Sequence, residues 1–438
     1  MSLGRNGIKN FSLGASNERQ RNRPPLILAA DYQIESTMKW LTLPAFGLSA
    51  LALSASAETE SRSGGRGFGG PTSVQEELES DPIGGQPTGL EAWNGWKDEL
   101  YTRTGLKFSV EYNSLMQWLS SSASEEDAFG GGNARLFGSW TLLGKDTKNH
   151  GSLVFRVDNR HAYTAEDPQF GSLGAGTGLP TGSLFSGREW GLVNLQWSQA
   201  ILDGRGGFVF GMSPADDYFH AYALANPLTA FSNLAFSIGA ETAIPDTGLA
   251  VAAGTMLGEH FYWKGGLHDA NGSSSDPNLD VLGDWELYKN LEVGWTSEQG
   301  RMYLDNFHLG VWHADERSEA GVPEDWGVVA NASWYFDEWR LLPFLRGGWS
   351  DGKSTLLDAQ VSAGVGMQVR DSDLFGAGFS WGSPASEGLS DQWTGECFYR
   401  IQLRNLAITP SLQLVLNPAS NPDEDAMLLG GLRGRIVF

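Results

Sequence analysis

The residues of this chain best suited to bind a polar solute are arginines separated by even numbers of positions. Arg433 and Arg435, for example, are two apart, so in an extended strand they project from the same face. A guanidinium group is planar, donates paired hydrogen bonds and stacks on aromatic rings, which suits hydroxyl groups as well as anions. Alternatively, the arginines pair with acids such as Asp158 or Glu111 and only stiffen the wall. Strand alternation predicts eight arginines on one polar face: Arg135, Arg156, Arg160, Arg346, Arg400, Arg404, Arg433 and Arg435.

A second group of polar and aromatic residues lies in the long connection 214–247. This connection is too apolar to extend into water, so we expect it to fold back against the rest of the protein. Two interpretations stay open: ordinary loop packing, or a segment that narrows a pore. The residues concerned are expected to be helical and are Asp216, Asp217, Tyr218, Phe219, His220 and Tyr222.

No motif in the sequence predicts catalysis. The glycine-rich stretch 171–182 lacks the spacing of a phosphate loop and is expected to be a surface loop. The stretch 269–280 offers closely spaced oxygen ligands but does not match an EF-hand, so a plain polar loop is favoured over a calcium site. Cys397, the only cysteine, has no flanking His or Asn motif and is expected to be a small apolar strand residue. We therefore predict no catalytic residue, no metal site and no cofactor.

From Leu106 onward, apolar and hydrophilic residues alternate with a period of two, which is typical of strands. These strands are the elements that position the candidate residues. Alternation is clearest in 358–370, 408–417 and the last strand, where apolar and hydrophilic residues take opposite faces. Single-chain bacterial barrels need an even strand number. We predict sixteen strands, at 106–119, 132–143, 151–161, 188–200, 206–213, 248–256, 260–268, 285–296, 302–313, 327–336, 340–350, 358–369, 374–382, 392–404, 406–417 and 428–438.

The connections between these strands alternate in length. Turns after even-numbered strands are short, whereas the connections after odd-numbered strands are mostly longer, up to the 214–247 segment. Outer-membrane barrels have short periplasmic turns and long outer loops. The sequence thus predicts an all-β, sixteen-stranded antiparallel transmembrane barrel over 105–438, with both barrel ends periplasmic and 214–247 folded inside as a constriction loop.

The residues before the barrel have the composition of an exported chain. The apolar run 40–53 follows Met38-Lys39 and precedes Ala55-Ser56-Ala57, the pattern of a signal peptide cut before Glu58. We therefore expect residues 38–57 to be a signal peptide and the polar stretch 1–37 to be a non-native upstream extension. Residues 58–104 are predicted to be a flexible periplasmic lead-in followed by a short helix near 90–103.

The charge of the chain excludes one class of partner. Its net charge is −22, with 30 Lys and Arg against 52 Asp and Glu. Nucleic-acid binding requires clustered basic residues, so no nucleic-acid partner is expected.

Four segments resemble carbohydrate-selective porins of the OprB type, which are bacterial outer-membrane proteins. The C-terminal run ITPSLQLVLNPASNPDEDAMLLGGLRGRIVF looks like their closing hairpin, including the terminal Phe438. WNGWKDELYTRTGLKFSVEYNS, NPLTAFSNLAFSIGAETAIPDTGLAVAAG and GGLHDAN are also similar to that family. The resemblance implies a sixteen-stranded barrel in outer-membrane lipid, passive diffusion of mono- and small oligosaccharides, a pore lined by arginines, acids and aromatics, and recognition of Phe438 by the barrel-assembly machinery.

Other functions are less well supported by the sequence. A general or anion-preferring diffusion porin is the nearest alternative, because the same arginines would serve it. An outer-membrane enzyme would need a nucleophile or an acid–base pair on a recognisable signature. An adhesin would more often carry repeats or a passenger domain. Neither feature is found in the sequence.

Overall fold

The computed structural model describes Phe68 and residues 70–79, 89–370 and 372–438. The predicted upstream extension (1–37) and signal peptide (38–57) lie outside these residues. Both therefore stay predictions.

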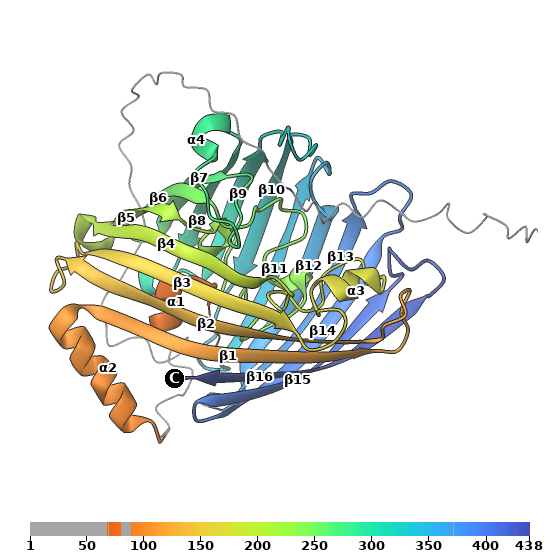
Figure 1. Ribbon diagram of the computed structural model, residues 1–438, viewed down its shortest axis with the longest axis horizontal. Helices are drawn as coiled ribbons and strands as arrows, with labels where there is room; N and C mark the ends of the chain where they lie inside the picture. The colour runs from red at the N-terminus through yellow and green to blue at the C-terminus, as the bar shows by residue number, and fades with distance from the viewer. Residues whose placement is uncertain (1–67, 69, 80–88, 371) are drawn as a thin grey trace, which may run out of the picture. The chain divides into compact units, whose positions relative to one another are not determined.

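Sixteen antiparallel strands form one closed barrel, in which each strand pairs with its neighbours in the chain and β1 pairs with β16 (Figure 1). The predicted fold class and strand number are confirmed. The strands are β1 (Leu106–Leu119), β2 (Ala128–Leu143), β3 (Gly151–Ala162), β4 (Glu189–Ile201), β5 (Gly206–Met212), β6 (Leu249–Leu257), β7 (Phe261–Asp269), β8 (Leu287–Thr296), β9 (Asn306–Ala314), β10 (Asp325–Ser333), β11 (Leu341–Ser350), β12 (Leu357–Gln368), β13 (Leu374–Pro384), β14 (Gln392–Leu403), β15 (Leu406–Leu416) and β16 (Ala426–Val437).

The helices are short and lie outside the strands. Among the described residues, no helix has the length and apolar character that a membrane span requires. The α-helices are α1 (Val74–Glu79), α2 (Glu91–Thr104), α3 (Phe170–Gly174) and α4 (Val281–Asp284), and the 3-10 helices are η1 (Leu202–Gly204), η2 (Ala215–Asp217), η3 (Leu234–Phe236) and η4 (Gln299–Arg301).

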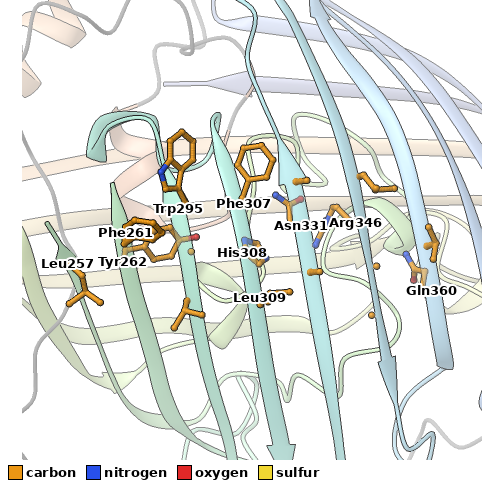
Figure 2. A pocket seen from close by; sticks show the side chains of 18 residues that line it. Leu257, Phe261, Tyr262, Trp295, Phe307, His308, Leu309, Asn331, Arg346 and Gln360 are labelled. Atoms are coloured by element: carbon orange, nitrogen blue, oxygen red, sulfur yellow. The ribbon is translucent and has the colours of Figure 1, made fainter. Parts of the chain in front are cut away.

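The strand alternation determines which residues face the lumen. In β14, Thr394 and Glu396 are buried inside the barrel while Trp393 projects outward and is 39% exposed. The wall from β6 to β12 behaves in the same way: Leu309 is 65% exposed, whereas its neighbour His308 is buried (Figure 2). A closed sheet with an apolar outer surface and a polar inner surface is stable in a lipid bilayer.

Helix α2 confirms the predicted short helix before the barrel. It ends at Gly105, whose φ of 78° is left-handed and whose N–H donates to the Tyr101 carbonyl. A Cβ at Gly105 would lie 2.4 Å from the Thr141 carbonyl oxygen, so glycine permits the close turn into β1. Trp93 and Trp96 of α2 stack at 5.0 Å and meet Phe108 of β1 edge-on.

Strand β9 and the segment before the barrel differ from the sequence prediction, as do the ends of several other strands, such as β2, which begins at Ala128 instead of 132. Strand β9 begins at Asn306 instead of 302, because residues 299–301 form the turn η4 and the Arg301 guanidinium holds Asp305 at 2.6 Å. Residues 74–79, expected to be part of a flexible lead-in, form helix α1, and Val74 is buried against Phe137 and Val154 inside the barrel. The expectation of a flexible segment is wrong there.

The facing of β15 can be tested with adjacent substitutions. Leu412 projects outward and is 46% exposed, and Ser411 projects inward, both near the middle of the strand. Leu412→Arg is expected to lower the free energy of unfolding by roughly 2–4 kcal/mol, because a charge near the bilayer midplane is costly. Ser411→Arg should cost much less. Urea titration in lipid vesicles measures both, and equal losses would contradict the assigned faces.

Candidate functional site: the lumen and its in-folded segments

The connection between β5 and β6 runs through the inside of the barrel. Its His220 N–H donates to Glu292 of β8 at 2.7 Å, and its Ala240 N–H donates to Gln360 of β12 at 3.0 Å. Its Pro227 carbonyl accepts from Arg433 of β16 at 2.6 Å. Only a segment in the lumen can reach strands spread around a closed barrel. The predicted in-folded loop is confirmed.

The expected helix within this loop is absent. The structure has two short 3-10 turns, η2 and η3, joined by irregular backbone. The physical reason is that backbone N–H groups of the loop donate to wall side chains instead of to the carbonyl groups of a helix. The Ser232 and Asn233 N–H groups, for example, donate to the two carboxylate oxygens of Glu396, each at 2.9 Å.

A second connection, between β3 and β4, also lies in the lumen. Gln117 and Gln413 donate to the Thr181 carbonyl at 3.0 and 2.9 Å, and the Ser183 N–H donates to the Ser232 carbonyl at 2.9 Å. The expectation of a surface loop over 171–182 is therefore wrong. Its small residues let the backbone approach the wall: a Cβ at Gly182 would lie 2.8 Å from the Leu115 side chain of β1.

Three of the predicted arginines anchor the β5–β6 loop. The Arg346 guanidinium donates to four loop carbonyls, among them Ser237 at 2.6 Å and His220 at 2.9 Å, and lies 4.3 Å from the Tyr222 ring centroid. Arg400 donates to the Thr229 carbonyl at 2.9 Å, and Arg433 donates to two more loop carbonyls. These side chains face inward as predicted, but their hydrogen-bond partners are backbone carbonyl groups of the loop.

Other arginines take part in a buried charge network on β1, β2, β3 and β16. Arg135 contacts Glu111 at 2.7 Å and Asp158 at 3.4 Å. Arg160 contacts Asp158 at 3.0 Å, and Arg435 contacts Glu111 at 2.5 Å. For these residues the structure supports the alternative that the arginines pair with lumenal acids and stiffen the wall.

The acids of η2 lie opposite an arginine of the wall. Asp217 is 3.6 Å from Arg156 and accepts from Asn194 at 2.9 Å. Asp216 is less enclosed and lines a small cavity where the two in-folded connections meet, together with Ser183 and Thr72. Among the predicted residues, Asp216 is thus one that is not fully buried.

Three of the predicted aromatic and imidazole side chains are not available for stacking. Phe219 and His220 are 1% exposed and Tyr222 is 0% exposed. They contact the wall, where His220 Nδ1, for example, lies 2.9 Å from His308 Nε2, so for these three residues the structure supports the interpretation of ordinary loop packing. Tyr218 is only partly buried, and its hydroxyl bonds to His268 at 2.7 Å.

Arg404 does not belong to the lumenal set. It lies beyond the end of β14, is exposed, and has a left-handed φ of 57° in the turn to β15. The prediction continued the strand by one residue too many. A turn residue has no fixed facing, so alternation does not apply to it.

Glu292 and Glu396 escaped the sequence analysis, although each accepts from backbone N–H groups of the in-folded β5–β6 loop. They have the inward position on their strands, so the same alternation that selected the arginines would have found them. Alternation did place Gln360 and Gln413 on the hydrophilic face, but it did not predict that they bind in-folded segments. Within the described part of the chain, no three His, Cys, Asp or Glu side chains gather as a metal site would require.

Asp216, which is partly enclosed by the two in-folded connections, is expected to make the pore charge depend on pH. Burial, and then the charge of Asp217, raise the pKa of Asp216 to about 6. Asp216 is therefore neutral below that pH and negative above it, so the preference for cations should rise between pH 5 and pH 7. Reversal potentials in a KCl gradient measure this. Asp216→Asn should remove the step, whereas Asp203→Asn, in an exposed turn, should keep it. A step that persists in Asp216→Asn contradicts the assignment.

Comparison with known proteins finds one family model that matches part of the chain. Residues 311–438 match the family model described as carbohydrate-selective porin, OprB family. No curated relative matches the chain.

Several solved structures are similar to this chain. The high-pH structure of Pseudomonas putida OprB matches with 16% identity and a TM-score of 0.63, over 79% of this chain and 97% of that one. Its low-pH structure matches with 14% identity and a TM-score of 0.49, over 79% and 96%. A triple mutant of Rhodopseudomonas blastica porin matches with 10% identity and a TM-score of 0.47, over 76% and 100%. At such identity the first of these shows a common fold. The family match covers residues 311–438, which is less than half of the chain, and the high-pH structure of Pseudomonas putida OprB shows that the barrel fold is shared.

Proposed function

We propose that the protein is an outer-membrane porin through which mono- and small oligosaccharides diffuse passively into the periplasm. The observation that carries this function is a closed sixteen-stranded barrel whose lumen is narrowed by two in-folded connections. Such a pore excludes large solutes without binding small ones tightly, as a conducting channel must. The family match supports sugars as the solutes.

The accessible polar groups of the lumen are the proposed solute pathway. Asp216, Tyr218 and Arg160 combine a carboxylate, an aromatic ring and a guanidinium on partly exposed side chains. Hydroxyl groups of a sugar can replace water at the charged groups while an apolar sugar face meets the ring. Weak contacts of this kind, which water can replace, allow a sugar to pass through the pore without being retained in it.

We also propose how the barrel is oriented and how the chain reaches the outer membrane. The short turns face the periplasm, outer-membrane lipid surrounds the apolar exterior, and the barrel-assembly machinery recognises Phe438. Residues 38–57 act as a cleaved signal peptide. N-terminal sequencing of protein from outer membranes should begin near Glu58, and a mature chain that keeps residues 1–37 would contradict this part.

Conductance in planar bilayers tests the function. The purified protein should form ohmic channels in KCl, and glucose should reduce their current in a concentration-dependent way. A general or anion-preferring porin would conduct without sugar block. Absence of any channel from correctly folded protein would contradict both.

A further inference from the structure

The segment formed by Phe68 and residues 70–79, here named the crossbar, is fastened at one end to β2 and β3. Glu77 of α1 contacts the Arg135 guanidinium of β2 at 2.8 Å, and both side chains are almost fully buried. Val74 packs against Phe137 and Val154 on the inner face. This end of the crossbar therefore rests on the lumenal wall (Figure 1).

The other end of the crossbar reaches the opposite wall. Phe68 is 0% exposed and meets the Tyr335 ring edge-on at 5.3 Å, just after β10. A Cβ at Gly366 of β12 would lie 2.9 Å from the Phe68 ring. In the closed barrel β2 and β10 are eight strands apart in either direction. The segment thus crosses the lumen from wall to wall.

Between its ends the crossbar is bonded to the in-folded β5–β6 loop. The Gly70 N–H donates to the Ala223 carbonyl at 3.0 Å, and the Thr72 carbonyl accepts from Arg156 at 2.6 Å. Asn226 of the loop donates to Glu77 at 2.8 Å. Glu77 accordingly joins three parts of the lumen: wall, loop and crossbar.

The crossbar lies toward the rim that carries the short turns. Tyr335 is in the turn between β10 and β11, and Val154 is near the first residues of β3. Gln75 donates to Ser198, near the end of β4 at the same rim. A solute that has passed the loop must therefore also pass the crossbar.

We propose that the crossbar is a further element of the pore constriction, beside the two in-folded connections, and that it sets the largest solute that passes. Glu77 is the positioning residue that holds it against both wall and loop. The proposal rests on the proposed function, since it assumes that the lumen conducts. It adds a size filter made by a segment outside the barrel strands and distinct from the β5–β6 loop.

The test replaces residues 68–79 of the full chain by a Gly-Ser linker of the same length. Single-channel conductance in KCl is expected to rise about two-fold or more, because part of the cross-section is vacated. In liposome-swelling assays, oligosaccharides that the unmodified protein excludes should enter. Heat-modifiable migration on gels reports that the barrel is folded.

Point variants keep the test decisive if the linker protein does not fold. Glu77→Ala should raise both conductance and the swelling cut-off, because wall and loop lose their common acceptor. Glu77→Gln, which keeps an acceptor oxygen, should restore much of the original cut-off. The matched control is Asp98→Ala, at an exposed position of α2, which should change neither.

Failure of the crossbar proposal can be distinguished from failure of the proposed function. If folded linker protein or Glu77→Ala shows unchanged conductance and an unchanged cut-off, the crossbar proposal is overturned. Glucose block of the unmodified protein tests the proposed function separately. Crossbar effects on ion conductance and swelling without sugar block would support the crossbar and contradict sugar selectivity.

Discussion

Replacing residues 219–241 by a short Gly-Ser linker is expected to raise single-channel conductance several-fold and to abolish glucose block. These residues occupy the middle of the lumen, where Arg346, Gln360 and Glu396 of the wall bind their backbone. Without them water fills the space that they occupied, and the passage through the lumen becomes wider. The barrel should still fold, because each strand is paired with its neighbours.

The same replacement should lower the thermal stability of the barrel. The wall arginines would exchange protein carbonyls for water, and the buried aromatic cluster around Tyr222 and Phe231 would be lost. The matched control shortens the exposed connection 316–323 between β9 and β10, which should change neither current nor block. Conductance and glucose block that stay the same after removal of 219–241 would show that the loop does not limit passage.

Arg135→Met is expected to destabilise the protein more than any other single arginine substitution in the wall. Its guanidinium is 1% exposed and contacts Glu77, Glu111 and Asp158 at 2.8, 2.7 and 3.4 Å. Methionine fills similar space but leaves three buried carboxylates without this cation. Breaking a buried ion pair from one side costs about 3–5 kcal/mol, which urea unfolding in lipid vesicles can measure.

Arg404→Met serves as the control for this substitution. Arg404 is exposed in a turn, and an exposed charge contributes about 0–1 kcal/mol. The unfolding free energy should therefore stay near that of the unmodified protein. Similar losses in the two variants would mean that the charge network around Arg135 does not stabilise the barrel.

Much of the barrel could be predicted because strand alternation is a local property. The pattern of 358–370 assigned Val361 to the lipid side and Gln360 to the inner side, and Val361 is indeed 50% exposed. Gln360 points inward as well, yet it is 2% exposed and accepts from the Ala240 N–H. Alternation sets the direction of a side chain, but it does not say whether water or a loop occupies the space beyond.

The in-folded segments were harder to predict because distant contacts determine them. Helix α1 has six residues and an acidic sequence, which in isolation favours a solvated lead-in. It is ordered by the Glu77 ion pair with Arg135 and by Val74 on the wall. Likewise, nothing local in 171–182 reveals that the Thr181 carbonyl accepts from Gln117 and Gln413. Alternation identifies the residues that can form the barrel wall, whereas the segments that fill the lumen can be identified only from the tertiary structure.

The pairing of β1 with β16 has a consequence for the kinetics of folding. All other strand pairs are between neighbours in the chain, whereas this seam joins Glu111 to Arg435, which are 324 positions apart. Contacts of such high contact order form late, since the entropy of closing the longest loop opposes them. Until the seam forms, β1 and β16 are two open edges with unpaired backbone groups, which favour association with other chains. Closure of this one seam is therefore the step at which an aggregation-prone sheet becomes a molecule without edges.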